Sequence, residues 1–316
     1  MWAHGHSGIP LTTPGAEQVR RTFRRILSGD EDGEPAWVRA LGEPGDAGWF
    51  GAGSTVWEVN GSLATLVGGV RALLLQACHP LALAGVEQHS NYREEPLGRL
   101  QRTNLFVTTS TFGSSSQAEA ATSLVRRVHE SVVGMAPDGR PYSASDPRLL
   151  MWVHVGLVDS MLVAAQHYHL APVAADEYVA GMALVGEALG VIDPPLSELA
   201  LKAELASFAD ELAGGPAAES VARFLRFPGL ALPVGAWAPY LVLSRAAVDL
   251  LPPWAHPLLH TPQRRGAVRN ADAMSCRAML RGLQGILGRY SQATRLSYAR
   301  LGIDPDSGTE INDSYR

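Results

Sequence analysis

Apolar side chains recur at every third or fourth position along almost the whole of this 316-residue chain. This spacing places them on one face of an α-helix, whereas a half-buried strand needs strict alternation, which is nearly missing here. The pattern therefore predicts an all-α protein. Hydrophobic residues make up 46% of the chain and charged residues only 18%, so a large apolar core with room for an internal cavity is expected.

Start and stop signals for helices indicate one main unit with two flanking segments. We expect residues 1–53 to form a helix and a loop that pack on the core, residues 54–303 to form the main helical domain, and residues 304–316 to be a loose polar tail. His4 and His6 lie in the N-terminal segment, and a frayed end is favoured over a metal site there.

Charge and targeting signals restrict the classes of partner. The net charge is −5 and the arginines are scattered among acidic residues, which argues against a nucleic-acid or anionic-membrane surface and favours a small-molecule partner. No secretory signal pattern is found, so a cytoplasmic location is expected, with Cys78 and Cys276 as buried thiols. Residues 227–244 are apolar but contain three prolines, which predicts a buried, broken segment and no membrane span. The oligomeric state stays open.

Cap and turn residues mark several elements of the main domain. A long apolar helix is expected over residues 54–78, and a final long helix over residues 270–302. Ser116 followed by Glu119 has the spacing of a capping box, so a helix is expected from there to Gly134. The segment 137–141 has turn chemistry compatible with a small hairpin, and Asp146 before Pro147 predicts the start of another helix.

His129 falls on the helix that follows Ser116, within a predicted apolar stripe. That stripe consists of Ala121, Leu124, Val125, Val128, Val132 and Val133. The imidazole is therefore expected to point inward. From spacing alone, a core histidine that forms a hydrogen bond is the commoner outcome, and an iron ligand is the rarer one.

Arg99 and Thr103 are four residues apart on the preceding predicted helix and share one face, with Arg102 on the adjacent edge. A guanidinium beside a hydroxyl on a partly apolar face suits an anionic cofactor group or a polarised oxygen species. The alternative is a surface salt bridge from Arg99 to Glu94 or Glu95, which the residues alone favour slightly.

Further histidines offer weaker indications. His79, Glu87, His89 and Tyr92 are expected near one another around a break at His79-Pro80, but the spacing of Glu87 and His89 does not suit a zinc site. One of the two histidines could line a cavity, and helix capping explains them about equally well. His154 shares a helix face with apolar residues, which favours a hydrogen-bonded core histidine over a ligand. Nucleophile-elbow, phosphate-loop and dinucleotide motifs are missing, which removes the main support for hydrolase, kinase and nicotinamide-dependent functions.

Several spaced blocks between about Trp57 and His260 resemble the MpaB/rubber-oxygenase catalytic domain family, which includes the latex-clearing proteins. These blocks are GGVRALLLQACHPLALAGVEQHSNYREEPLGRLQRT, VHESVVG, YSASDPRLLMWVH and LLPPWAHPLL. The resemblance implies a globin-like helical core with additional helices around b-type haem.

The resemblance also implies roles for individual residues. His129 matches the proximal iron ligand, and Arg99 and Thr103 match the arginine and threonine beside the haem cavity, so these roles replace the commoner alternatives. Arg102 stands where rubber oxygenases carry a distal lysine, and because a guanidinium stays protonated it is a poor iron ligand. Arg99, Arg102 and Thr103 are thus the catalytic candidates, with His154 as a further candidate for contact with the cofactor.

The function implied by the resemblance is a haem b oxygenase that uses dioxygen to oxidise or cleave a small apolar substrate, with an electron donor as a further partner. A haem peroxidase or a dehydrogenating oxidase of an aromatic natural product is one alternative. A haem or apolar-ligand binding protein without turnover is another, and a helical scaffold without a cofactor is the last.

Overall fold

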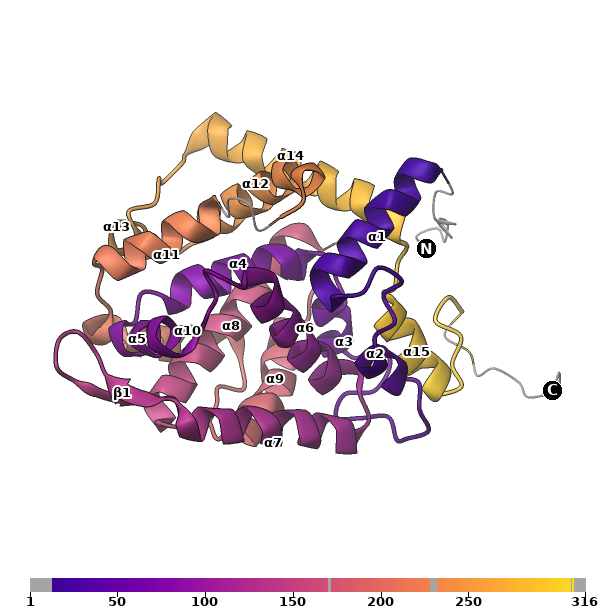
Figure 1. Ribbon diagram of the computed structural model, residues 1–316, viewed down its shortest axis with the longest axis horizontal. Helices are drawn as coiled ribbons and strands as arrows, with labels where there is room; N and C mark the ends of the chain where they lie inside the picture. The colour runs from indigo at the N-terminus through magenta and orange to yellow at the C-terminus, as the bar shows by residue number, and fades with distance from the viewer. Residues whose placement is uncertain (1–12, 170–171, 228–231, 308, 310–316) are drawn as a thin grey trace.

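The computed structural model describes residues 13–169, 172–227, 232–307 and 309, and these residues are mostly helical (Figure 1). They form fifteen α-helices, one short 3-10 helix and one two-stranded hairpin. The predicted helical class is therefore confirmed, while the globin-like arrangement stays a prediction. His4, His6 and most of the tail over residues 304–316 lie outside the described residues.

The elements follow one another along the chain in this order. They are α1 (Pro14–Ser28), α2 (Ala36–Ala40), α3 (Thr55–Asn60), α4 (Ala64–Gln76), α5 (Pro80–His89), α6 (Pro96–Phe112), α7 (Ser115–Ser131), β1 (Val133–Met135), β2 (Pro141–Ser143), α8 (Pro147–Tyr168), α9 (Ala175–Leu189), α10 (Glu198–Ser207), η1 (Ala209–Glu211), α11 (Pro216–Arg226), α12 (Val234–Asp249), α13 (Ala255–Leu259), α14 (Gly266–Leu287) and α15 (Gln292–Arg300).

The helices stack in succession across the molecule, from α14 at one edge to α7 at the other (Figure 1). α14 packs against α12, α12 against α4, α4 against α8, α8 against α9, and α9 against α7. α1 lies across α6 and α14. The interior of this stack is the largest apolar cluster, to which α8 contributes the fully buried Trp152, Val155 and Val158.

The helices α4 and α8 form the most extensive pair, and a glycine lets them approach closely. A Cβ atom placed on Gly68 would lie 3.1 Å from the Cα atom of Met161 and 3.1 Å from the carbonyl oxygen of Ser160. Two backbones can approach this closely only where no side chain intervenes. Asp146 starts α8 by accepting hydrogen bonds from the backbone N–H groups of Arg148 and Leu149, as its position before Pro147 predicts.

A buried ion pair joins the same two helices. Nη2 of Arg71 lies 2.7 Å from Oδ2 of Asp159, and the two side chains are 4% and 6% exposed. Arg71 also donates to the carbonyl oxygen of Leu250 at 2.9 Å and to Oγ of Ser160 at 2.7 Å. These bonds tie α4, α8 and the end of α12 together, and they satisfy a charge that would be costly if left alone.

Two predicted helices are divided in the structure. The helix expected over residues 54–78 is interrupted between α3 and α4, where Oγ of Ser62 accepts from the backbone N–H of Ala64. The helix expected over residues 270–302 ends at Gly288, which has a φ of 87°, and Ser291 caps a new helix. In each case a local side-chain cap competes with continuation of the helix.

The hairpin predicted from turn chemistry is confirmed, because β1 and β2 pair antiparallel with Val133 opposite Ser143. The described residues also include one helix, α8, that is long and apolar enough to cross a bilayer, with 72% of its apolar window buried inside the fold. The bent pair α4 and α5, at 106°, passes the same test only when taken together. Packing against α4 and α9 already accounts for the apolar character of α8.

Candidate functional site

The helices α6 and α7 form a helical hairpin. A capping box that lies two residues earlier than predicted sets its turn. The hydroxyl of Ser114 accepts from the backbone N–H of Gln117, and the side chain of Gln117 accepts from the backbone N–H of Ser114. The predicted pair Ser116 and Glu119 is therefore wrong. The reason is local: Gly113 leaves α6 with extended backbone, so Ser114 is the residue in position to cap.

The face that α7 turns inward also differs from the predicted stripe. Ala118 and Thr122 are buried, while Leu124 and Val128 are 52% and 53% exposed. The inward face therefore continues from Thr122 through the half-buried Val125 to His129, at alternating spacings of three and four. His129 points inward as expected, although three members of its predicted stripe, Leu124, Val128 and Val133, do not.

His129 lies in the last turn of α7, and its imidazole has no hydrogen-bond partner among the described residues. Its Nδ1 atom is buried and unpaired. Burial lowers the pKa of the ring, which favours the neutral imidazole with a free electron pair on one nitrogen. The interpretation as a hydrogen-bonded core histidine is thus wrong, and an unpaired buried nitrogen costs about 1–3 kcal/mol unless something binds it.

Arg99 lies in the first turn of α6, at the same open end of the hairpin as His129. Its Nη1 donates to Oγ of Ser90 at 2.5 Å, and its guanidinium carbon lies 5.9 Å from the ring centroid of Tyr92. Burial lowers the pKa of the half-buried guanidinium. In the part of the chain that the structure describes it has no carboxylate partner, so the predicted salt bridge to Glu94 or Glu95 is wrong.

Ser90 is a residue at this site that the sequence did not single out, and Tyr92 was noted only as a neighbour of His79, Glu87 and His89. Tyr92 is 7% exposed, and its hydroxyl donates to the carboxylate of Glu87, which also pairs with Arg93 at 3.0 Å. Burial, followed by the hydrogen bond to Glu87, raises the pKa of Tyr92, so its ring stays neutral beside Arg99. Both residues lie in the connection between α5 and α6, where helical periodicity carries no signal.

Thr103 and Arg102 occupy more open positions on α6. The hydroxyl of Thr103 donates to the carbonyl oxygen of Arg99 at 3.0 Å, one turn back along the helix. Both side chains are exposed, and within the described residues Arg102 has neither a hydrogen bond nor an ion pair. Arg99 and Thr103 therefore share a face as predicted, and Arg102 stands free at its edge.

His154 is buried in the middle of α8 and faces α9. A Cβ atom on Gly186 would lie 2.8 Å from Cε1 and 2.9 Å from Nδ1 of the imidazole, so the ring rests directly on the glycine. Its Nε2 is buried without a partner among the described residues, and burial lowers its pKa to about 4. The expectation of a hydrogen-bonded core histidine is wrong here as well.

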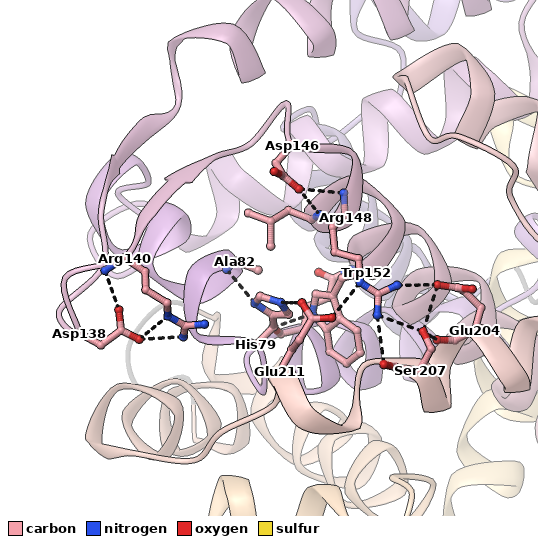
Figure 2. A network of polar contacts seen from close by, with 12 residues as sticks. His79, Ala82, Asp138, Arg140, Asp146, Arg148, Trp152, Glu204, Ser207 and Glu211 are labelled. Atoms are coloured by element: carbon pink, nitrogen blue, oxygen red, sulfur yellow. Dashed lines mark hydrogen bonds and ion pairs between the residues drawn. The ribbon is translucent and has the colours of Figure 1, made fainter.

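His79 belongs to a polar network at the start of α5 (Figure 2). Nδ1 accepts from the backbone N–H of Ala82 and so caps α5, while Nε2 lies 3.4 Å from the carboxylate of Glu211. The guanidinium of Arg148 pairs with both carboxylates beside it: Nε lies 2.8 Å from Oε1 of Glu211, and Nη1 lies 2.8 Å from Oε1 of Glu204. Burial is the main cause that lowers the pKa of His79. Helix capping is thus the role that its contacts support.

The three residues around the His79-Pro80 break do not converge on one point. His79 pairs with Glu211, Glu87 with Tyr92, and Nε2 of His89 lies 3.1 Å from the hydroxyl of Tyr142. Only Glu87 reaches the surroundings of Arg99, and it does so through Tyr92. Among the described residues no three metal-ligating side chains gather, whereas a haem iron needs only one protein ligand.

Comparison with known proteins identifies the family. Residues 57–284 match the family described as "ER-bound oxygenase mpaB/B'/Rubber oxygenase, catalytic domain". No significant match was found among curated proteins or among solved structures. The matched segment covers well over half of the chain and includes Arg99, His129 and His154. The chain therefore belongs to the MpaB/rubber-oxygenase catalytic domain family, a family of oxidoreductases.

Proposed function

We propose that this protein is a haem b-dependent oxygenase that uses dioxygen to oxidise or oxidatively cleave a small apolar substrate. The observation that carries the proposal is His129, a half-buried neutral imidazole with an unpaired buried nitrogen at the open end of the α6–α7 hairpin. An imidazole with these properties is a suitable ligand for haem iron. Its place within the matched oxygenase domain supports that assignment.

Two further residues have properties that suit such a group. Arg99 carries a half-buried positive charge without a carboxylate partner among the described residues, which suits an anionic group or a polarised oxygen. His154 presents a second unpaired nitrogen from α8 and is the further candidate for contact with the cofactor. Bound haem would supply the iron centre at which dioxygen is activated.

The chain's own groups supply orientation and charge. Ser90 and the ring of Tyr92 hold the guanidinium of Arg99 in one place, so its donors are preorganised. The hydroxyl of Thr103 donates its hydrogen bond to the carbonyl oxygen of Arg99, which leaves the lone pairs of Oγ1 as acceptors. Arg102 adds an exposed positive charge at the edge of this face, where a lysine-type iron ligand is not expected.

The proposed reaction needs dioxygen, an electron donor and an apolar substrate, and the proposed location is the cytoplasm. The test is turnover of the purified, haem-loaded protein with a panel of small unsaturated hydrocarbons and terpenoids under isotopically labelled dioxygen. Label in the product supports the oxygenase. A product that forms only with peroxide and carries no label would favour a peroxidase, and oxygen binding without any product would favour a binding protein. Either of these results would overturn the proposal.

A further inference from the structure

A cavity whose lining includes neither His129 nor Arg99 lies where the end of α12 meets α13 and the start of α14. Its volume is about 230 Å³. Arg264, Arg265 and Arg269 line it together with Asp249, and its other walls are mostly apolar. Three arginines around one small cavity form an unusual concentration of positive charge in a chain whose net charge is −5.

Among the described residues, only one of these three arginines forms ion pairs with carboxylates. Arg264 lies 2.8 Å from Oδ1 of Asp249 and 3.5 Å from Oδ2 of Asp272. Arg265 donates to the side chain of Gln263, and neither Arg265 nor Arg269 has an ion-pair partner among the residues that the structure describes. Arg265 also precedes the first turn of the 22-residue helix α14, whose first N–H groups have no side-chain cap. These donors and the helix dipole favour an anion.

Asp249 adds an acceptor to the same cavity. Its side chain is 5% exposed, and Oδ1 is held by Arg264. Oδ2 is buried and has no hydrogen-bond partner among the described residues. A buried carboxylate oxygen of this kind needs a donor, and the nearby charge of Arg269 does not supply a hydrogen bond to it.

We propose that this cavity binds a phosphate group that carries a proton, either as inorganic phosphate or as the end of a phosphomonoester. Arg265, Arg269 and the start of α14 donate to the phosphate oxygens, and the P–OH group donates to Oδ2 of Asp249. This arrangement satisfies both the unpaired arginines and the unpaired carboxylate oxygen. Sulfate has the same shape but no proton at neutral pH, so it would face Asp249 with a repelling oxygen.

The first experiment compares inorganic phosphate with sulfate by isothermal titration calorimetry on the full-length protein at neutral pH. We expect phosphate to bind at least about tenfold more tightly than sulfate, because one charge-assisted hydrogen bond is gained and one repulsion avoided. The double variant Arg265→Gln/Arg269→Gln should lose phosphate binding by at least about tenfold. Arg281→Gln, on the exposed part of the same helix and outside the cavity lining, is the matched control.

The second experiment removes the selectivity for phosphate over sulfate. Asp249→Asn keeps Oδ1 as the acceptor for Arg264 and places an amide N–H group where Oδ2 stood. Sulfate binding should therefore rise by about tenfold relative to phosphate binding. Should this variant fail to fold, the arginine variants still decide the matter. Equal binding of phosphate and sulfate by the unaltered protein, or no binding of phosphate, would overturn the proposal.

A third arm distinguishes the two sources of the phosphate group. At about pH 5.5, below the second pKa of about 6 of a phosphomonoester, both inorganic phosphate and glycerol phosphate carry a proton. Tighter binding of glycerol phosphate would assign the cavity to phosphomonoesters, and tighter binding of inorganic phosphate to the free ion. Sulfate, measured at the same pH, corrects for any effect of pH on the cavity lining itself, which also includes His167 and His256. The inference is independent of the proposed oxygenase function.

Discussion

Nη1 of Arg99 and Oγ of Ser90 lie 2.5 Å apart, and this is the hydrogen bond that holds a half-buried guanidinium without a carboxylate partner among the described residues. A charge in such a place is retained at a cost in stability. In a protein of this family, the cost is understandable if the charge serves binding or catalysis. Replacements at Arg99 and Ser90 should therefore affect stability in opposite ways.

Arg99→Met should leave the free energy of unfolding unchanged or raise it by up to about 1 kcal/mol, because it removes a poorly compensated charge. Ser90→Ala should lower it by about 1 kcal/mol, since the guanidinium loses its hydrogen bond. Urea unfolding of the purified variants measures both, with the exposed Arg281→Met as control. A loss of more than about 2 kcal/mol in Arg99→Met would identify Arg99 as structural.

Replacement of Arg71, which pairs with Asp159, should change the free energy of unfolding in the opposite direction to replacement of Arg99. Arg71→Met removes one partner of a buried ion pair and leaves Asp159 uncompensated, so unfolding should become easier by about 3–5 kcal/mol. The double variant Arg71→Met/Asp159→Leu should recover part of this loss, because no charge is then buried. Equal stability of the single and double variants in chemical denaturation would contradict the role given to the pair.

The contact between Gly186 and His154 predicts a steric effect. Gly186→Ala would place a methyl group 2.8 Å from Cε1 of the imidazole, so the ring or the helix must move, at a cost of about 1–3 kcal/mol. Gly282→Ala on α14 meets no atom within 4 Å and should stabilise the helix by about 0.5–1 kcal/mol. Thermal unfolding distinguishes the two substitutions, and similar effects of both would refute the close contact.

His154 should also make stability depend on pH. Burial lowers its pKa to about 4, below the unfolded value of about 6.5, so the unfolded chain binds a proton more readily than the folded chain. The free energy of unfolding therefore has its full value above about pH 6.5 and falls as the pH falls. By pH 4 this loss of stability amounts to about 3 kcal/mol. His154→Leu should flatten the dependence of the unfolding free energy on pH in this range. An unchanged slope would show that the ring is accessible to protons in the folded protein.

Much of the fold follows from signals that the sequence carries locally. The break at His79-Pro80, the cap of α8 at Asp146 and the hairpin over residues 133–143 are confirmed, because each depends on a few adjacent residues. The interruption near Ser62 was not predicted, because one serine inside an apolar helical pattern is not a clear stop signal. The cap at Ser114 was placed at Ser116 instead, because three adjacent serines compete for the same role. Only the backbone geometry decides between them.

The candidate site was predictable in part. Periodicity placed His129 and His154 on inward faces, and both have buried nitrogens in the structure. It could not show that these nitrogens lack partners, because that depends on what neighbouring helices bring to the same point. The contacts of Ser90 and Tyr92 with Arg99 were missed for a related reason: a connection between helices has no period that would show which residues turn toward Arg99.

The most direct test of the account is the absorption spectrum of the purified protein from haem-replete cells, oxidised and then reduced under carbon monoxide. The account predicts a Soret band that shifts with carbon monoxide, is lost or altered in His129→Gly, and is restored to that variant by added imidazole. His260→Gly, which replaces an exposed histidine paired with Glu219, should keep the original spectrum. A protein without a Soret band, or a His129→Gly variant with an unchanged band, would contradict the assignment of His129 as the iron ligand.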